Sequence, residues 1–80
     1  MSAIPDDPNT MLTRDKFVAA LNEAGFPITV STLATKATRG GGPPFQKFGI
    51  KPLYQWGPGL AWAKSRLSKP VRTTSELEAA

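Results

Sequence analysis

The sequence predicts a small, mainly α-helical domain of three short helices, with one β-hairpin between the second and the third. Two stretches repeat apolar residues at the i, i+3, i+4, i+7 spacing that marks one face of a helix. A glycine- and proline-rich segment at residues 40–44 ends the second stretch, and two short aromatic runs separated by a turn follow it. Eighty residues, 40% of them apolar, suffice for one such domain with a modest core.

The first helix is expected over residues 14–24. Thr13 is a good N-cap, and Asp15 in the first turn opposes the helix dipole. Gly25 follows at the position where glycine commonly ends a helix. The apolar face consists of Phe17, Ala20, Leu21 and Ala24.

The second helix is expected to begin after Thr29 and to end before Gly40. Its apolar face consists of Val30, Leu33, Ala34 and Ala37. Its polar face presents Ser31, Thr32, Thr35, Lys36 and Arg39. Two short helices joined by a tight turn form the helix-turn-helix pattern.

The hairpin is expected to pair residues 45–48 with residues 53–56 across the turn at 49–52. Phe45 and Phe48 cannot share one face of a regular strand, because side chains alternate between faces. A bulge, or a phenylalanine at the sheet edge, would resolve this conflict. The pattern nevertheless indicates two short antiparallel strands.

The third helix is expected to have Gly57 as its cap and Pro58 as its first helical residue, and Pro70 limits it. We expect residues 1–11 to be a disordered N-terminal lead and residues 12–68 to be the folded domain. Residues 69–80 are expected to be a flexible C-terminal tail.

Charge is distributed unevenly along the chain. Residues 24–75 contain eight Lys and Arg residues and no Asp or Glu. Because a one-signed stretch repels itself in a compact state, this pattern indicates an anionic partner, with nucleic acid ahead of an anionic membrane. No apolar run approaches the ~20 residues of a membrane span, and no signal segment is seen, so we expect a cytoplasmic protein.

The absence of Cys and His excludes several kinds of catalytic site. Neither a thiolate nucleophile, a histidine-containing triad nor a His/Cys zinc site can be built. The carboxylates lie mainly near the two ends of the chain, which makes an acid–base pair difficult to assemble. We therefore expect no enzyme activity, no cofactor, no metal and no small-molecule substrate.

Two segments are candidates for contact with double-stranded DNA. The polar face of the second helix offers groups that reach phosphates and base edges, although a solvated polar face is the simpler interpretation. Lys47 and Lys51 flank Gly49, whose lack of a side chain allows close backbone approach, although they also fit an ordinary tight turn. The aromatic residues Tyr54, Trp56 and Trp62 suit base stacking, but a domain this small needs them for its core.

The order of these features resembles a known family. It comprises Thr32-Leu33, Gly42-Pro43-Pro44-Phe45, Lys47, Gly49, Tyr54 and Leu60-Ala61-Trp62. This order is similar to that of the small winged helix-turn-helix proteins of the excisionase and MerR-like superfamily. It most resembles the recombination directionality factors of prophages and integrative elements, over residues 12–68.

The resemblance implies a DNA-binding architectural protein of bacterial or phage origin that associates with the nucleoid. The second helix would enter the major groove, and the wing would place Lys47, Ile50 and Lys51 along the adjacent minor groove. Such factors bind tandem sites cooperatively beside neighbouring copies, bend DNA and help a tyrosine-type integrase to excise a mobile element. The alternatives are a transcriptional regulator of the same fold, a small RNA-binding protein that uses the aromatics, and a protein–protein adaptor. The adaptor would use Ile50, Trp56 and the tail.

Overall fold

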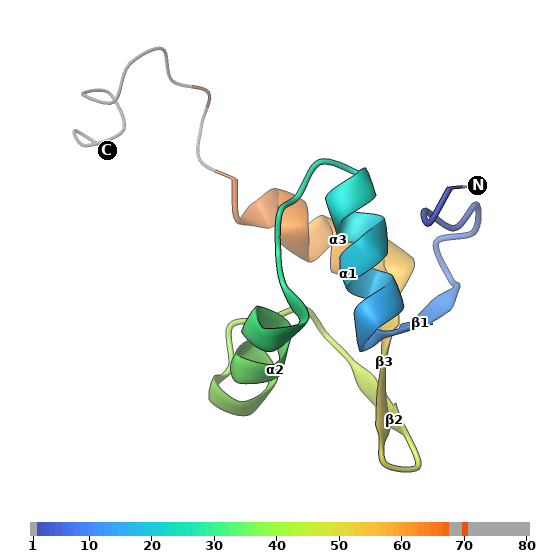
Figure 1. Ribbon diagram of the computed structural model, residues 1–80, viewed down its shortest axis with the longest axis vertical. Helices are drawn as coiled ribbons and strands as arrows, with labels where there is room; N and C mark the ends of the chain where they lie inside the picture. Colours follow the sequence, from blue (N-terminus) through green and yellow to red (C-terminus); the bar gives the residue numbers. More distant parts are fainter. Residues whose placement is uncertain (1, 68–69, 71–80) are drawn as a thin grey trace, which may run out of the picture.

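The computed structural model describes residues 2–67 and residue 70, and it contains three helices and a three-stranded antiparallel sheet within those residues. In chain order these are β1 (Met11–Thr13), α1 (Arg14–Glu23), α2 (Val30–Arg39), β2 (Gln46–Phe48), β3 (Lys51–Gln55) and α3 (Trp56–Ser65). Helices α1 and α3 pack at one end of the domain, and α2 and the β2–β3 hairpin project from the other end (Figure 1). This arrangement is compatible with a winged helix-turn-helix.

The first two helices form where the sequence predicts them. Helix α1 ends one residue earlier than predicted, and Gly25 follows it with a φ of 102°. Helix α2 is capped by Thr29, whose Oγ1 accepts a hydrogen bond from the Thr32 amide at 3.1 Å. Gly40, with a φ of 92°, lies in the left-handed region at the other end of α2. The capping residue and the glycines thus fix both ends of α2.

Strand β1 is an element that the sequence did not predict. It pairs with β3 in the register Met11↔Gln55, Leu12↔Tyr54 and Thr13↔Leu53, which makes β3 the central strand in the order β1-β3-β2. Three residues are too few to display a period-2 pattern on their own. The strand is defined by its pairing with residues 40 to 44 positions away.

The described part of the N-terminal lead, residues 2–11, contacts the beginning of α3, whereas the sequence predicted a disordered lead over residues 1–11. The Gly57 amide donates to the Pro8 carbonyl at 2.7 Å, and the Trp56 amide donates to the Thr10 carbonyl at 3.0 Å. These amides belong to the first helical turn, which has no partners for them inside the helix. The lead satisfies them, and Ile4 packs against the core.

Helix α3 begins at Trp56, two residues before the predicted first helical position. Pro58 therefore lies inside the first turn, where its missing N–H costs no intrahelical hydrogen bond. Gly59 is buried, and a Cβ atom at this position would overlap the ring of Phe17. The glycine allows α3 to pack closely against α1.

The hairpin turn contains two residues, Gly49 and Ile50, rather than the predicted four. Phe48 pairs directly with Lys51, and Gly49 has a φ of 66°, as the first central residue of a type II′ turn requires. Pro52 lies in β3 and pairs with Lys47 of β2. On its other side Pro52 has no partner among the described residues, because the pairing between β1 and β3 ends at Leu53. Because Lys47 and Pro52 form a pair without mutual hydrogen bonds, the missing N–H breaks no ladder bond.

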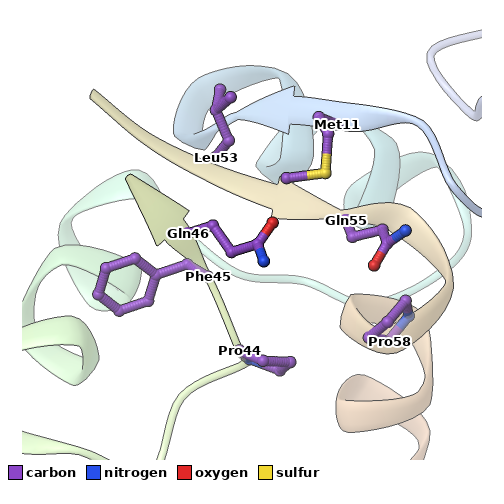
Figure 2. Close-up of a pocket in the computed structure, with 7 residues that line it drawn as sticks. All are labelled: Met11, Pro44, Phe45, Gln46, Leu53, Gln55 and Pro58. Atoms are coloured by element: carbon purple, nitrogen blue, oxygen red, sulfur yellow. The ribbon is translucent and has the colours of Figure 1, made fainter. Parts of the chain in front are cut away.

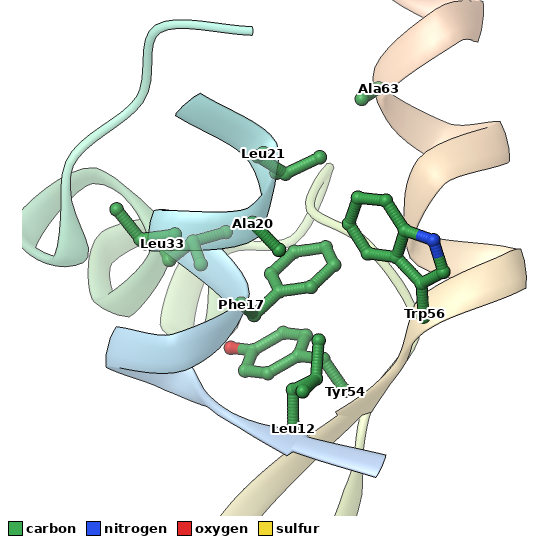
Figure 3. Packing of buried hydrophobic residues seen from close by; sticks show 9 residues of the cluster. Leu12, Phe17, Ala20, Leu21, Leu33, Tyr54, Trp56 and Ala63 are labelled. Carbon is green, nitrogen blue, oxygen red and sulfur yellow. The ribbon is translucent and has the colours of Figure 1, made fainter. Parts of the chain in front are cut away.

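The core lies between α1, the sheet and α3 (Figure 3). Phe17 and Tyr54 stack with ring centroids 4.9 Å apart and planes 8° apart, and Trp56 meets Phe17 edge-on at 6.1 Å. Phe45 packs against Tyr54 at 5.6 Å, whereas Phe48 is 78% exposed, so the two phenylalanines face different environments. The remaining buried apolar residues are Leu12, Val18, Ala20, Leu21, Leu33 and Ala63.

No helix among residues 2–67 is long and apolar enough to cross a membrane. Most of the C-terminal tail predicted over residues 69–80 lies outside the described residues. Two of the eight cations counted between residues 24 and 75, Lys69 and Arg72, also lie outside the described residues.

Candidate nucleic-acid interface

Helix α2 presents a ridge of hydroxyl groups to solvent. At about 100° of rotation per residue, Ser31, Thr35 and Thr38 lie opposite Leu33, the buried residue of this helix. The hydroxyls of Thr35 and Thr38 donate to carbonyls one turn earlier, at 3.1 and 3.3 Å. Each oxygen retains acceptor capacity toward solvent. The ridge is therefore polar, uncharged and accessible along its length.

A groove separates α2 from the hairpin. Ala34, Ala37 and Thr38 line it on one side, and Phe45, Lys47, Ile50 and Pro52 line it on the other, with Arg14 between them. The groove shows that the hairpin faces the side of α2 that carries Ala34, Ala37 and Thr38.

Two cationic side chains, Arg14 and Lys47, line this groove, and further cations lie near it. Lys47 and Lys51 extend from the hairpin and Arg39 from the last turn of α2, and all three are exposed. Arg14 begins α1, lies 6.0 Å above the Tyr54 ring, and donates through Nε to the Tyr54 hydroxyl at 3.2 Å. We call Arg14, Lys36, Arg39, Lys47 and Lys51, with the hydroxyl ridge, the basic face.

The predicted α2 residues occupy different parts of the basic face. Ser31 and Thr35 lie on the ridge, and Arg39 lies beside it. Thr32 is exposed, but its hydroxyl accepts a 2.9 Å hydrogen bond from the Thr29 hydroxyl, so it also belongs to the cap. Lys36 is half-buried and lies close to the glycine turn: a Cβ atom added to Gly42 would be 3.0 Å from the Cβ of Lys36. Lys36 thus reaches the face from the side away from the hairpin.

Two residues of this face were missed from the sequence. Thr38 follows Thr35 by three residues and Ser31 by seven, so the helical spacing was a sufficient signal for it. Arg14 lies 33 residues before Lys47 in the chain, and no local pattern links the two. Only the packing of α1 against the sheet brings Arg14 beside the hairpin.

One carboxylate lies at the rim of the basic face. Asp15 shares a shallow depression with Arg14, Val30 and Lys51. Its pKa is lowered from the ordinary value, first by the Thr13 hydroxyl and then by backbone amides at the start of α1. Asp15 is therefore ionised at neutral pH and weakens the positive field of the face locally.

The aromatic residues considered for base stacking are mainly structural. Tyr54 and Trp56 are buried, which confirms the prediction that they belong to the core. Trp62 is half-buried, and its Nε1 donates to the Gly41 carbonyl at 3.0 Å. This bond fixes the α2–β2 connection to α3.

The outer face of the sheet carries a second surface feature, a small apolar pocket. Met11, Leu53 and Gln55 come from β1 and β3, and Pro44, Phe45, Gln46 and Pro58 complete the lining (Figure 2). The pocket lies across the sheet from the core and away from the hydroxyl ridge. Among residues 2–67 and 70, no group of three His, Cys, Asp or Glu side chains is placed to hold a metal ion.

No protein-family model, curated protein sequence or solved structure significantly matches this chain.

Proposed function

We propose that this protein is a winged helix-turn-helix protein that binds double-stranded DNA through its basic face. In this proposal the hydroxyl ridge of α2 enters the major groove, and the β2–β3 hairpin acts as the wing along the adjacent minor groove. The observation that carries the proposal is that Arg14 of α1 and Lys47 of the hairpin line one groove beside the hydroxyl ridge of α2. The predicted contacts are Ser31, Thr32, Thr35, Lys36 and Arg39 on α2, and Lys47, Gly49, Ile50 and Lys51 on the wing.

The kinds of element on the face, one helix and one narrow hairpin, support a duplex as the partner. A major groove about 12 Å wide admits one α-helix, and a neighbouring minor groove about 6 Å wide admits a narrow hairpin. Hydroxyl, lysine and arginine groups are those that contact phosphates and base edges. By contrast, the single-stranded alternative relies on base stacking by aromatic rings, and two of the three residues predicted for it, Tyr54 and Trp56, are buried.

We further propose that DNA binding serves an excisionase-type recombination directionality factor, a proposal that rests on the family resemblance. A single small module buries only about 600–1,000 Å² on DNA, so useful specificity requires neighbouring copies on tandem sites. The partners are then duplex DNA, further copies of the chain and a tyrosine-type integrase. The protein would act in the cytoplasm at the nucleoid, as an architectural protein without catalysis, cofactor or small-molecule substrate.

The experiment compares two variants that remove the same charge. Lys36→Ala with Arg39→Ala removes two cations from α2. Lys64→Ala with Arg66→Ala removes two exposed cations from the C-terminal end of α3, at the other end of the domain (Figure 1). In shift assays the α2 variant is expected to lose duplex binding, while the α3 variant retains it. Equal loss in both variants would contradict a localised interface.

The genomic position of the binding sites separates the two roles that share this fold. Sites in attachment-site arms support the directionality factor. Sites confined to promoter elements support the transcriptional regulator.

A protein–protein adaptor is the second candidate, because the outer sheet pocket is apolar and accessible. Trp56, one of the residues predicted for this role, is buried and cannot contribute. Met11, at the pocket rim, is 37% exposed and is the better probe. The adaptor predicts partner binding that survives high salt and is lost in Met11→Glu, with no affinity for duplex DNA.

A further inference from the structure

The tip of the β2–β3 hairpin carries the two most exposed large apolar side chains of the described residues. Ile50 is 93% exposed and Phe48 is 78% exposed. Isolated apolar residues are common on protein surfaces. These two lie at one projecting tip, and Lys47 and Lys51 flank them. The combination of apolar and cationic groups at a projecting tip suits a partner with an anionic surface and an apolar interior.

The tip is narrow at its apex. The turn consists only of Gly49 and Ile50, so a single side chain extends from the end of the hairpin. Pro52 stiffens the strand that follows. Ile50 is β-branched, so few rotamers are lost when it is inserted into a partner. The apex is thus a thin, stiff support for one apolar group.

Ile50 and Phe48 differ in the direction they face. Ile50 lines the groove between the hairpin and α2, together with Ala34 and Lys47. Phe48 follows Lys47 directly in β2, so the side chain of Phe48 points to the opposite side of the hairpin from that of Lys47, which lines the groove. Ile50 is therefore on the side that meets a duplex bound to α2.

We propose that Ile50 acts as an apolar wedge that enters the minor groove and partly unstacks one base step. This inference rests on the proposed DNA-binding function and adds the means by which the protein would bend DNA. Apolar wedges inserted from the minor groove kink duplexes by roughly 20–90° toward the major groove. Lys47 and Lys51 contact the phosphates on the two sides of the groove. Pyrimidine–purine steps are the favoured sites, because they unstack most easily.

A ligase circularisation assay tests the wedge without knowledge of the target sequence. Fragments of about 120 base pairs circularise poorly, because they are shorter than the ~150 base-pair persistence length of DNA. At protein concentrations that give equal DNA occupancy, the wild-type chain is expected to increase circle formation. Ile50→Ser is expected to reduce that increase at least about fivefold, because the kink is lost. Since Ile50 is almost fully exposed, the substitution leaves the core intact.

Phe48→Ser is the matched control, because it removes another exposed apolar side chain from the other side of the same hairpin. It is expected to circularise DNA as the wild type does. Circle formation by Ile50→Ser at the wild-type level would overturn the wedge while leaving DNA binding in place. Failure of the wild-type chain to bind any duplex would instead overturn the proposed function, and binding only to vesicles of anionic phospholipid would assign the tip to a membrane surface.

Discussion

The salt dependence of DNA binding is set by the number of cations on the basic face, and the hairpin supplies two of the five. If all five contact phosphates, the slope of log affinity against log salt is about −4.5, at about 0.9 per contact. Affinity then falls about 500-fold between 50 and 200 mM salt. Lys47→Ala with Lys51→Ala leaves three contacts, a slope of about −2.7 and a fall of only about 40-fold over the same range.

The assay is fluorescence anisotropy of a labelled 24-base-pair duplex at a series of salt concentrations. Lys47 and Lys51 are exposed, so the double variant is expected to melt at the wild-type temperature. The control removes Lys64 and Arg66 from α3, which lowers net charge equally and is expected to keep the wild-type slope. An unchanged slope in the hairpin variant, or an equal change in the α3 control, would refute the assignment of the hairpin to the interface.

Three further predictions concern single residues. Gly59→Ala is expected to lower the free energy of unfolding by about 1–3 kcal/mol despite the gain in helix propensity, because the added methyl group overlaps the Phe17 ring. Thermal melts measure this change, and a stabilised variant would contradict the close packing of α1 and α3. Asp15→Asn is expected to tighten duplex binding, because it removes an ionised group from the rim of the basic face. Because the folded-state pKa of Asp15 is lowered, the ionised carboxylate stabilises the fold above the ordinary pKa of 3.8, and this stabilisation disappears as pH falls through the lowered value. Thermal melts of the wild type and of Asp15→Asn from pH 2 to 7 would show the difference. Trp62→Phe removes the hydrogen bond to the Gly41 carbonyl and is expected to lower the free energy of unfolding by about 0.5–1.5 kcal/mol. Amide hydrogen exchange in residues 40–42 is expected to become faster. Unchanged exchange would show that the bond does not restrain the turn.

The two N-terminal helices were predictable because their information is local. Phe17 and Leu21 of α1, and Leu33 and Ala37 of α2, repeat at helical spacing, and glycine follows each helix. The polar face of α2 followed from the same periodicity. The start of α3 was misplaced, because Pro58 is compatible with several positions in a first turn.

The sheet was less predictable because it depends on distant contacts. Strand β1 exists through its pairing with β3, and the lead before it contacts amides at the start of α3. The conflict between Phe45 and Phe48 was visible in the sequence, but the packing of Phe45 on Tyr54 resolved it. Arg14 joined the basic face for the same reason, since its neighbours come from α2 and the hairpin.

The most direct test of the central claim is a shift assay with short duplexes from the chromosome around the protein's own gene, at low and physiological salt. We predict discrete, cooperative bands on a site beside an integrase gene or attachment sequence, with affinity that decreases steeply as salt rises. Absence of duplex binding at low salt would contradict the DNA-binding role of the basic face and favour the adaptor.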